Sequence, residues 1–153
     1  MKHIADIIEK GIKEHPELSV GMQTDGIEVA SVGNTIILHE SCLVEAFNLK
    51  AAIQFNMKNL NAAREALTDM PPRSEAELDQ TTLHNIAMMN MEEEPSAGFE
   101  KLQFLIQQNA FPDETFANLC ILYVKYSFYS FVADVLAENA HLTYKYLTPV
   151  SDN

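Results

Sequence analysis

The chain has 153 residues, with 22 acidic side chains against 10 basic ones and a formal net charge of −12. Phosphate backbones and anionic membrane surfaces require Lys and Arg, so this balance argues against nucleic acid and lipid headgroups as partners. Hydrophobic residues make up 47% of the chain and glycine occurs only 5 times. That composition provides the core of one folded domain and excludes low-complexity and collagen-like classes.

The two cysteines, Cys42 and Cys120, have no metal-ligand spacing and lie among apolar neighbours. We therefore expect both to be buried free thiols in a reducing cytosol. The longest apolar run, residues 119–124, is far shorter than a membrane span, and the charged N-terminus has no signal-peptide core. No membrane insertion, cofactor or metal site is predicted.

The first helix is predicted over residues 1–16, because Ile4, Ile8 and Ile12 recur at helical spacing and Pro16 ends the pattern. Residues 17–39 differ, since "GIEVASVGNTIIL" sets a Gly33-Asn34 pair between β-branched residues. This stretch predicts either a β-hairpin or an extended loop with possible strand pairing.

Apolar stripes at helical spacing fill the rest of the chain and fall into pairs separated by prolines. The predicted pairs occupy residues 40–71, 80–111 and 112–139, and residues 140–153 begin a further helix that is cut short. Ser41 is the expected N-cap of the first pair. The breaks fall at Pro71-Pro72, Pro112 and Pro149, where proline closes one helix and is tolerated at the start of the next.

Helix pairs with this period predict an all-α solenoid, and the pattern matches the tetratricopeptide repeat best. The third pair shows the pattern most fully, with a bulky residue, a Leu/small pair and an aromatic residue at Phe116, Leu119-Cys120 and Tyr123. The fold expected is therefore about three helix pairs, preceded by an N-terminal helix and an extended loop.

Seven segments of the chain carry a more specific resemblance: "SVGNT", "LVEAFNLKAAI", "LTDMPPRSEAELD", "TLHN", "GFEKLQFLIQQN", "FPDETFANL" and "ADVLAENAHLTYKYLTP". From about residue 14 to residue 149 the chain resembles the tetratricopeptide repeat protein 30, or fleer, family. The resemblance implies a subunit of the intraflagellar transport B complex, located in cilium or flagellum and cytoplasm. It also implies a non-enzymatic role in cilium assembly, with a link to tubulin polyglutamylation.

The resemblance further implies partners, namely other B-complex subunits and in particular a proline-rich segment of one of them, which the family's superhelix encloses. Family members are several times longer, so we expect this chain to be an internal fragment. Two other functions stay open: a generic adaptor of the chaperone-cofactor type, and direct participation in tubulin glutamylation. The chain shows no phosphate-binding glycine loop and no catalytic constellation, so no enzyme is predicted.

The repeat register predicts which helix positions face a concave, mostly apolar groove suited to a proline-rich ligand. These candidate partner-binding residues are Asn48, Ala52, Phe55, His84, Met88, Met91, Ala117, Ile121, Val124 and Lys125. A second candidate is the aromatic group of Tyr123, Tyr126, Phe128, Tyr129 and Phe131. It is typical either of a core or of a stacking platform.

Overall fold

The computed structural model describes residues 1–18 and 31–147, which contain α-helices, short 3-10 turns and no strand. The α-helices are α1 (Lys2–Glu14), α2 (Ile36–Ser41), α3 (Leu43–Asn56), α4 (Leu60–Asp69), α5 (Gln80–Glu93), α6 (Pro95–Ile106), α7 (Glu114–Lys125), α8 (Tyr129–Glu138) and α9 (Ala140–Tyr146). A 3-10 turn, η2 (Glu75–Glu77), lies between α4 and α5. No helix in these ranges has both the length and the apolar character needed to cross a membrane.

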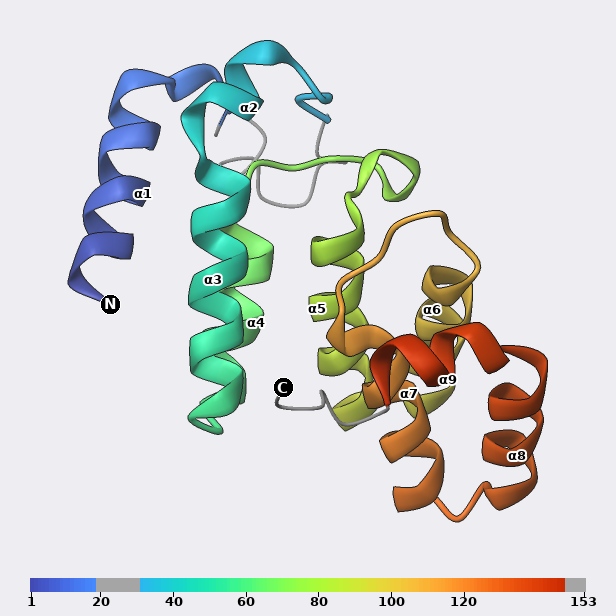
Figure 1. Cartoon of the computed structure of the whole chain (residues 1–153). Coiled ribbons are helices and arrows are strands. Elements are labelled where there is room, and N and C mark those ends of the chain that lie inside the picture. Colours follow the sequence, from blue (N-terminus) through green and yellow to red (C-terminus); the bar gives the residue numbers. More distant parts are fainter. Residues whose placement is uncertain (19–30, 148–153) are drawn as a thin grey trace, which may run out of the picture.

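The helices are arranged as successive antiparallel pairs, α3 with α4, α5 with α6 and α7 with α8 (Figure 1). The second helix of each pair also contacts the first helix of the next, because α4 packs on α5, α6 on α7 and α8 on α9. Helix α1 lies along α3 and covers its outer side (Figure 1). The prediction of an all-α helix-pair solenoid is confirmed.

The turns inside the first and third pairs have the same backbone structure. Lys58 and Ser127 both have a φ of 63°. In each turn the amide of the following residue bonds to a carbonyl five residues earlier, Asn59 to Gln54 and Phe128 to Tyr123, both at 2.8 Å. A left-handed residue with this bond is the standard way to close a helix. Neither position holds glycine, so both turns carry the steric cost of a β-carbon.

The turn of the middle pair is different and tighter. Helix α5 ends at Glu93, and Pro95 begins α6 at a position where its missing N–H is not needed. Gly98 lets α6 approach α5, because a β-carbon there lies 2.8 Å from the Ala87 carbonyl oxygen and 2.5 Å from the Met91 sulfur. The three glutamates and proline at 92–95 therefore mark a helix junction, as the sequence indicated.

The segment before the first pair contradicts the hairpin prediction. Residues 19–30 lie outside the described residues. After them Gly33 has a φ of 71°, and Thr35 then caps α2 by accepting a hydrogen bond from the Leu38 amide at 3.2 Å. Residues 36–39 are thus helical, not extended. The Val32 amide instead donates to the Pro72 carbonyl at 2.8 Å, in the linker between the first two pairs.

The α2–α3 junction corrects two further predictions. Ser41 ends α2, and Cys42, with a φ of 58°, occupies the N-cap position of α3. The Ser41 hydroxyl still accepts a hydrogen bond from the Leu43 amide at 3.2 Å. Cys42 is exposed rather than buried, because it lies at this corner, whereas Cys120 is buried as expected.

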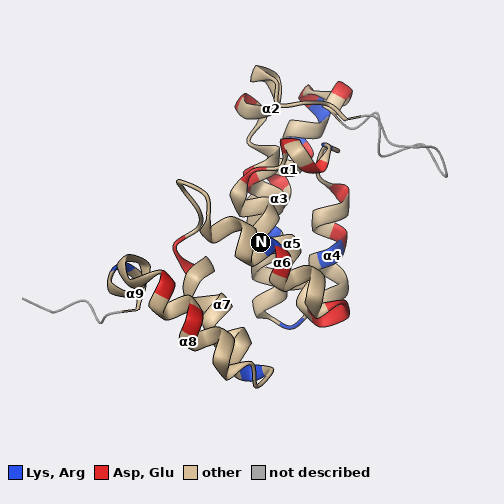
Figure 2. Ribbon diagram, turned by 90° about the vertical axis from the view of Figure 1, so that its right-hand side faces the viewer, with Lys and Arg blue, Asp and Glu red and all other residues tan. Residues whose placement is uncertain are grey.

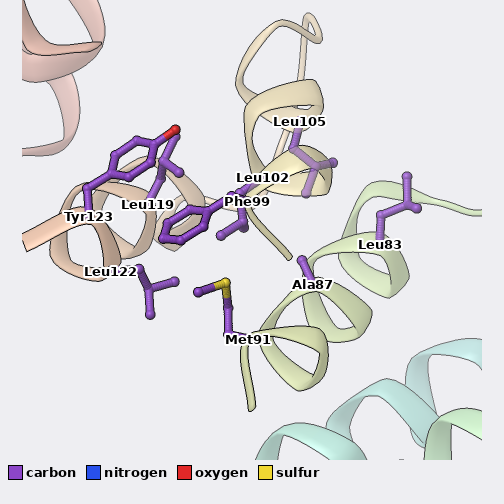
Figure 3. Close-up of a cluster of buried hydrophobic side chains, with 9 residues drawn as sticks. All are labelled: Leu83, Ala87, Met91, Phe99, Leu102, Leu105, Leu119, Leu122 and Tyr123. Carbon is purple, nitrogen blue, oxygen red and sulfur yellow. The ribbon is translucent and has the colours of Figure 1, made fainter. Parts of the chain in front are cut away.

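A continuous apolar cluster joins the second and third pairs (Figure 3). Phe99 of α6 stacks on Tyr123 of α7, with ring centroids 4.7 Å apart and planes 8° from parallel. The Met91 side chain points toward these rings from α5 (Figure 3). The buried members of this apolar cluster are Leu83, Ala87, Met91, Phe99, Leu102, Leu105, Leu119, Leu122 and Tyr123.

The aromatic residues after α7 divide between the two expected environments. Tyr123 belongs to the core, and the Tyr126 hydroxyl donates to the Met91 carbonyl at 3.0 Å. Phe128, Tyr129 and Phe131 are exposed, and α8 has no fully buried residue. The core reading is confirmed for Tyr123, and the stacking-platform reading of the exposed residues stays a prediction.

Candidate functional site

A groove of about 1040 Å³ opens between α3 and α5, with the N-terminal turns of α2 and α7 at its ends. Figure 1 shows α3 and α5 as neighbouring first helices of their pairs. The residues that line the groove come from five helices, α2, α3, α4, α5 and α7, and from the segments before α2, α5 and α7. They include Thr35, His39, Glu45, Asn48, Leu49, Ala52, Phe55, Arg73, Asp79, His84, Asn85, Met88, Glu114 and Asn118.

Asparagine side chains connect the first two pairs across the groove. Asn48 of α3 is 4% exposed and donates to the Thr82 hydroxyl at 2.9 Å. The Asn85 side chain of α5 donates back to the Asn48 side-chain oxygen at 3.1 Å. Because buried amides are costly unless they are bonded, these reciprocal bonds fix the register of α3 against α5.

An ion pair between a buried arginine and a partly exposed aspartate supports one end of the same network. The Arg73 side chain is 3% exposed and donates to an Asp79 carboxylate oxygen at 3.1 Å. Asp79 also caps α5, since it accepts hydrogen bonds from the Thr82 amide at 3.1 Å and the Thr82 hydroxyl at 2.6 Å. Burial alone raises the pKa of Asp79, but the bonds from Thr82 and Arg73 together outweigh it and lower the pKa.

A second polar contact connects the second and third pairs. The Asn118 side-chain nitrogen of α7 lies 3.2 Å from Nε2 of His84 on α5. An amide nitrogen only donates, so this contact requires a lone pair on Nε2 and hence a neutral imidazole. Burial lowers the pKa of His84, partly offset by the nearby Glu114 carboxylate. The neutral ring that Asn118 needs is therefore the favoured form.

Most of the surface that lines the groove is apolar, and polar groups lie within it. Phe55, Met88 and Leu49 supply apolar surface, and amide, imidazole and carboxylate groups lie between them. Glu45, Asp79 and Glu114 give the lining a negative excess over Arg73, which is already paired with Asp79. Figure 2 shows the same imbalance over the whole fold, where Asp and Glu are more frequent than Lys and Arg.

The structure brings together only part of the predicted site. Asn48, Ala52, Phe55, His84 and Met88 line the groove. Met91 does not, because its side chain is buried in the core against α6 (Figure 3). Ala117, Ile121, Val124 and Lys125 also lie outside the lining, and Ile121 and Val124 are 63% and 49% exposed. On α7 the groove is lined by Glu114 and Asn118, in the first two turns of that helix.

Several lining residues were not predicted, because they lie outside the first helices of the repeats. Arg73 and Asp79 belong to the linker, and His39 belongs to α2. Asp79, an N-cap residue type immediately before the helical pattern, is the signal that could have located the α5 start. Within residues 1–18 and 31–147, no group of three or more His, Cys, Asp or Glu side chains is arranged to hold a metal ion.

Comparison with known proteins finds relatives that are named intraflagellar transport protein 70. It is 71% identical over 149 residues to intraflagellar transport protein 70A of Xenopus tropicalis, an alignment that covers 97% of this chain and 23% of that protein. It is 69% identical to intraflagellar transport protein 70B of Mus musculus, with 97% and 22% covered. The chain thus spans less than a quarter of the length of these curated relatives.

A family model also matches the C-terminal part of the chain. The model describes the intraflagellar transport protein 70 C-terminal domain and matches residues 115–152, from α7 onward. The names of the relatives and of this domain agree with the family resemblance carried by the sequence.

Proposed function

We propose that this chain is a segment of an intraflagellar transport 70 protein and acts as a non-enzymatic protein-binding scaffold of the B complex. Its place is the cilium or flagellum and the cytoplasm, where it supports cilium assembly. The observation that carries the proposal is the groove between α3 and α5, which combines apolar surface with amide groups in a helix-pair solenoid. The identity of about 70% to proteins named for intraflagellar transport supports intraflagellar transport as the process in which the groove acts.

The ligand that this groove suits is an extended, proline-rich segment of a partner subunit. Such a segment has carbonyl oxygens that no internal hydrogen bond satisfies, and its prolines offer no N–H. It therefore needs donors from the receptor together with apolar surface for its rings. Each side-chain amide has two N–H donors, and the contact with His84 uses one of those of Asn118. Phe55 and Met88 line the same groove and supply the apolar contacts.

The link to tubulin polyglutamylation is indirect in this proposal, because the scaffold supports transport of the modifying enzymes. A ligase needs a nucleotide site, and the described residues form only helices and turns. A chaperone-cofactor adaptor needs exposed Lys or Arg to hold a peptide carboxylate. Among the described lining residues only Arg73 is basic, and it is buried against Asp79.

The test is the identity of the proteins that associate with the chain. Tagged chain expressed in ciliated cells is purified at low salt and its partners are identified by mass spectrometry. We expect B-complex subunits with a proline-rich segment to be enriched over an untagged control. Enrichment of chaperones alone supports the adaptor alternative, and recovery of neither contradicts the scaffold proposal.

A further inference from the structure

The linker between the first two helix pairs carries one exposed serine in a distinctive setting. Ser74 lies in "PPRSEAELD", so that glutamates follow it at the first and third positions and Asp79 at the fifth. It is the only serine or threonine of the 153 residues with an acidic residue three positions later. Acid-directed protein kinases select their substrates by a carboxylate at that position, which pairs with basic groups of the kinase.

We propose that Ser74 is a phosphorylation site for an acid-directed serine/threonine kinase. In the reaction the Ser74 hydroxyl oxygen attacks the γ-phosphorus of ATP while the bond to the ADP oxygen breaks. The hydroxyl proton passes to the catalytic base of the kinase, and ADP leaves with the bonding electrons. The product has a phosphate monoester at Ser74 with a charge of about −2.

The local backbone suits the approach of a kinase. Ser74 is exposed and already extended, with a φ of −68° and a ψ of 157°. Only the single 3-10 turn Glu75–Glu77 follows it, and this turn is closed by the bond from the Glu77 amide to the Ser74 carbonyl at 2.9 Å. One 3-10 turn is a weak element, so a kinase opens it at little cost.

Phosphorylation acts on a clasp that attaches residues 31–34 to this linker. The Glu77 carboxylate accepts hydrogen bonds from the Ser31 hydroxyl and from the Ser74 amide, the latter at 3.1 Å. The Glu77 carbonyl accepts from the Asn34 side chain at 2.8 Å. The bond from Ser31, followed by that from the Ser74 amide, lowers the pKa of Glu77 and keeps its carboxylate charged. The clasp thus depends on an anion beside Ser74.

A phosphate on Ser74 opens the clasp because it places a second anion in the capping box that Ser74 and Glu77 share. Like charges at this distance repel, and the nearest cation does not neutralise them. Arg73 is buried and committed to Asp79 and Thr82, at 3.1 and 3.4 Å. Since Asn34 and Thr35 line the groove, opening the clasp changes that end of the candidate site.

The first test incubates the whole chain with ATP and a purified kinase of the casein kinase 2 class, and maps phosphate by tandem mass spectrometry. We expect one phosphoserine at position 74 and no incorporation in Ser74→Ala. Glu77→Gln removes the charge three positions after Ser74 and slows the reaction at least about tenfold, whereas Glu100→Gln, at an exposed position of α6, leaves the rate unchanged. Phosphate at another residue, no incorporation, or an unchanged rate in Glu77→Gln overturns the proposal.

The second test measures amide hydrogen exchange in residues 31–34 before and after phosphorylation. The Val32 amide is protected by its bond to Pro72 and the Gly33 amide by its bond to the Ser31 hydroxyl. Phosphorylation is expected to speed the exchange of these two amides about tenfold. That factor corresponds to the loss of one hydrogen bond to a charged group. Ser31→Ala removes the Ser31–Glu77 bond without adding charge and gives a similar increase at the Val32 amide, which does not bond to Ser31. Unchanged exchange in the phosphorylated chain contradicts the clasp. Neither test depends on the proposed partner.

Discussion

The Asn85 side chain donates to the Asn48 side-chain oxygen at 3.1 Å, across the boundary between the first and second helix pairs. Asn48 in turn donates to the Thr82 hydroxyl, so one buried residue satisfies polar groups at two positions of α5. The same residues form part of the groove. The packing of the pairs and the shape of the candidate site therefore depend on the same hydrogen bonds.

Loss of this connection should destabilise the fold. Asn48→Ala leaves the Thr82 hydroxyl and the Asn85 amide without these bonds and is expected to lower the free energy of unfolding by about 2 kcal/mol. Adding Asn85→Ala should cost less than the sum of the two single changes, with a coupling of about 1 kcal/mol. Urea unfolding measures both values. Asn61→Ala, at an exposed position of α4, is the control, and equal losses at positions 48 and 61 contradict the account.

The His84–Asn118 contact predicts sensitivity to mild acid. The pKa of His84 is lowered in the fold, so the unfolded chain binds a proton at a higher pH than the folded chain does. The contribution of neutral His84 to the free energy of unfolding should therefore be fully present above the pKa of about 6.5 that histidine has in the unfolded chain. It should be lost as the pH falls below that pKa. Thermal melts between pH 7.5 and pH 5 should show a decrease in Tm.

Two substitutions separate His84 from other titrating groups. In His84→Gln the decrease in Tm across this range should become smaller. Glu114→Gln removes the carboxylate that partly offsets burial, so the same decrease should become larger. Identical profiles for all three proteins would show that His84 does not titrate as the structure implies.

The shared turn conformation predicts that glycine stabilises at two distant positions. Lys58→Gly and Ser127→Gly relieve a β-carbon at positive φ, and each is expected to raise the free energy of unfolding by about 1 kcal/mol. Glu65→Gly, inside α4, is the control and should lower it by about 1 kcal/mol. Chemical denaturation distinguishes the two signs. A loss at either turn would contradict the left-handed assignment.

The two helical glycines at close contacts should respond differently to alanine. At Gly98 the new β-carbon meets the Ala87 backbone oxygen, which cannot move without shifting α5, so a loss of about 1–3 kcal/mol is expected. At Gly11 it meets the Leu43 side chain, 2.6 Å from Cδ2, which can change rotamer. Gly11→Ala should therefore cost less than Gly98→Ala. Melting temperatures in the reverse order would contradict the close α5–α6 packing.

The cysteines should differ in reactivity. Cys42 is exposed, whereas Cys120 is buried and burial raises the pKa of its thiol. Under native conditions iodoacetamide should alkylate Cys42 alone, and Cys120 should react only after denaturation. Intact-protein mass spectrometry counts the adducts. Rapid double labelling of the folded chain would contradict the burial of Cys120.

Helical periodicity predicted the pairs because buried stripes such as Phe47 and Ala51 record the 3.6-residue repeat directly. It failed at residues 36–39, where β-branched residues favour a strand locally. There the Thr35 cap and the burial of Leu38 in an apolar cluster that includes Leu43 and Phe47 stabilise a helix instead. Local preference was overridden by tertiary contacts that no short window contains.

The groove was harder to predict than the fold, because its lining depends on how the pairs are rotated against one another. Met88 and Met91 are one helical turn apart, yet only Met88 lines the groove. Gly98 has no β-carbon, so α6 packs closely on Met91. Arg73 and Asp79 also line the groove, but they lie in the linker between α4 and α5. That linker has no helical periodicity from which their positions could be predicted. The amide connection likewise joins residues more than thirty positions apart.

The most direct test of the scaffold account compares two charge substitutions in the same tagged chain. Met88→Glu places a carboxylate inside the groove, and Ile121→Glu places one on α7 outside its lining, where the residue is 63% exposed. Circular dichroism first establishes that both variants keep their helicity, and co-purification of the proline-rich B-complex subunit is then measured in ciliated cells. The account predicts loss of that subunit with Met88→Glu and retention with Ile121→Glu. Retention with Met88→Glu, or loss only with Ile121→Glu, would contradict it.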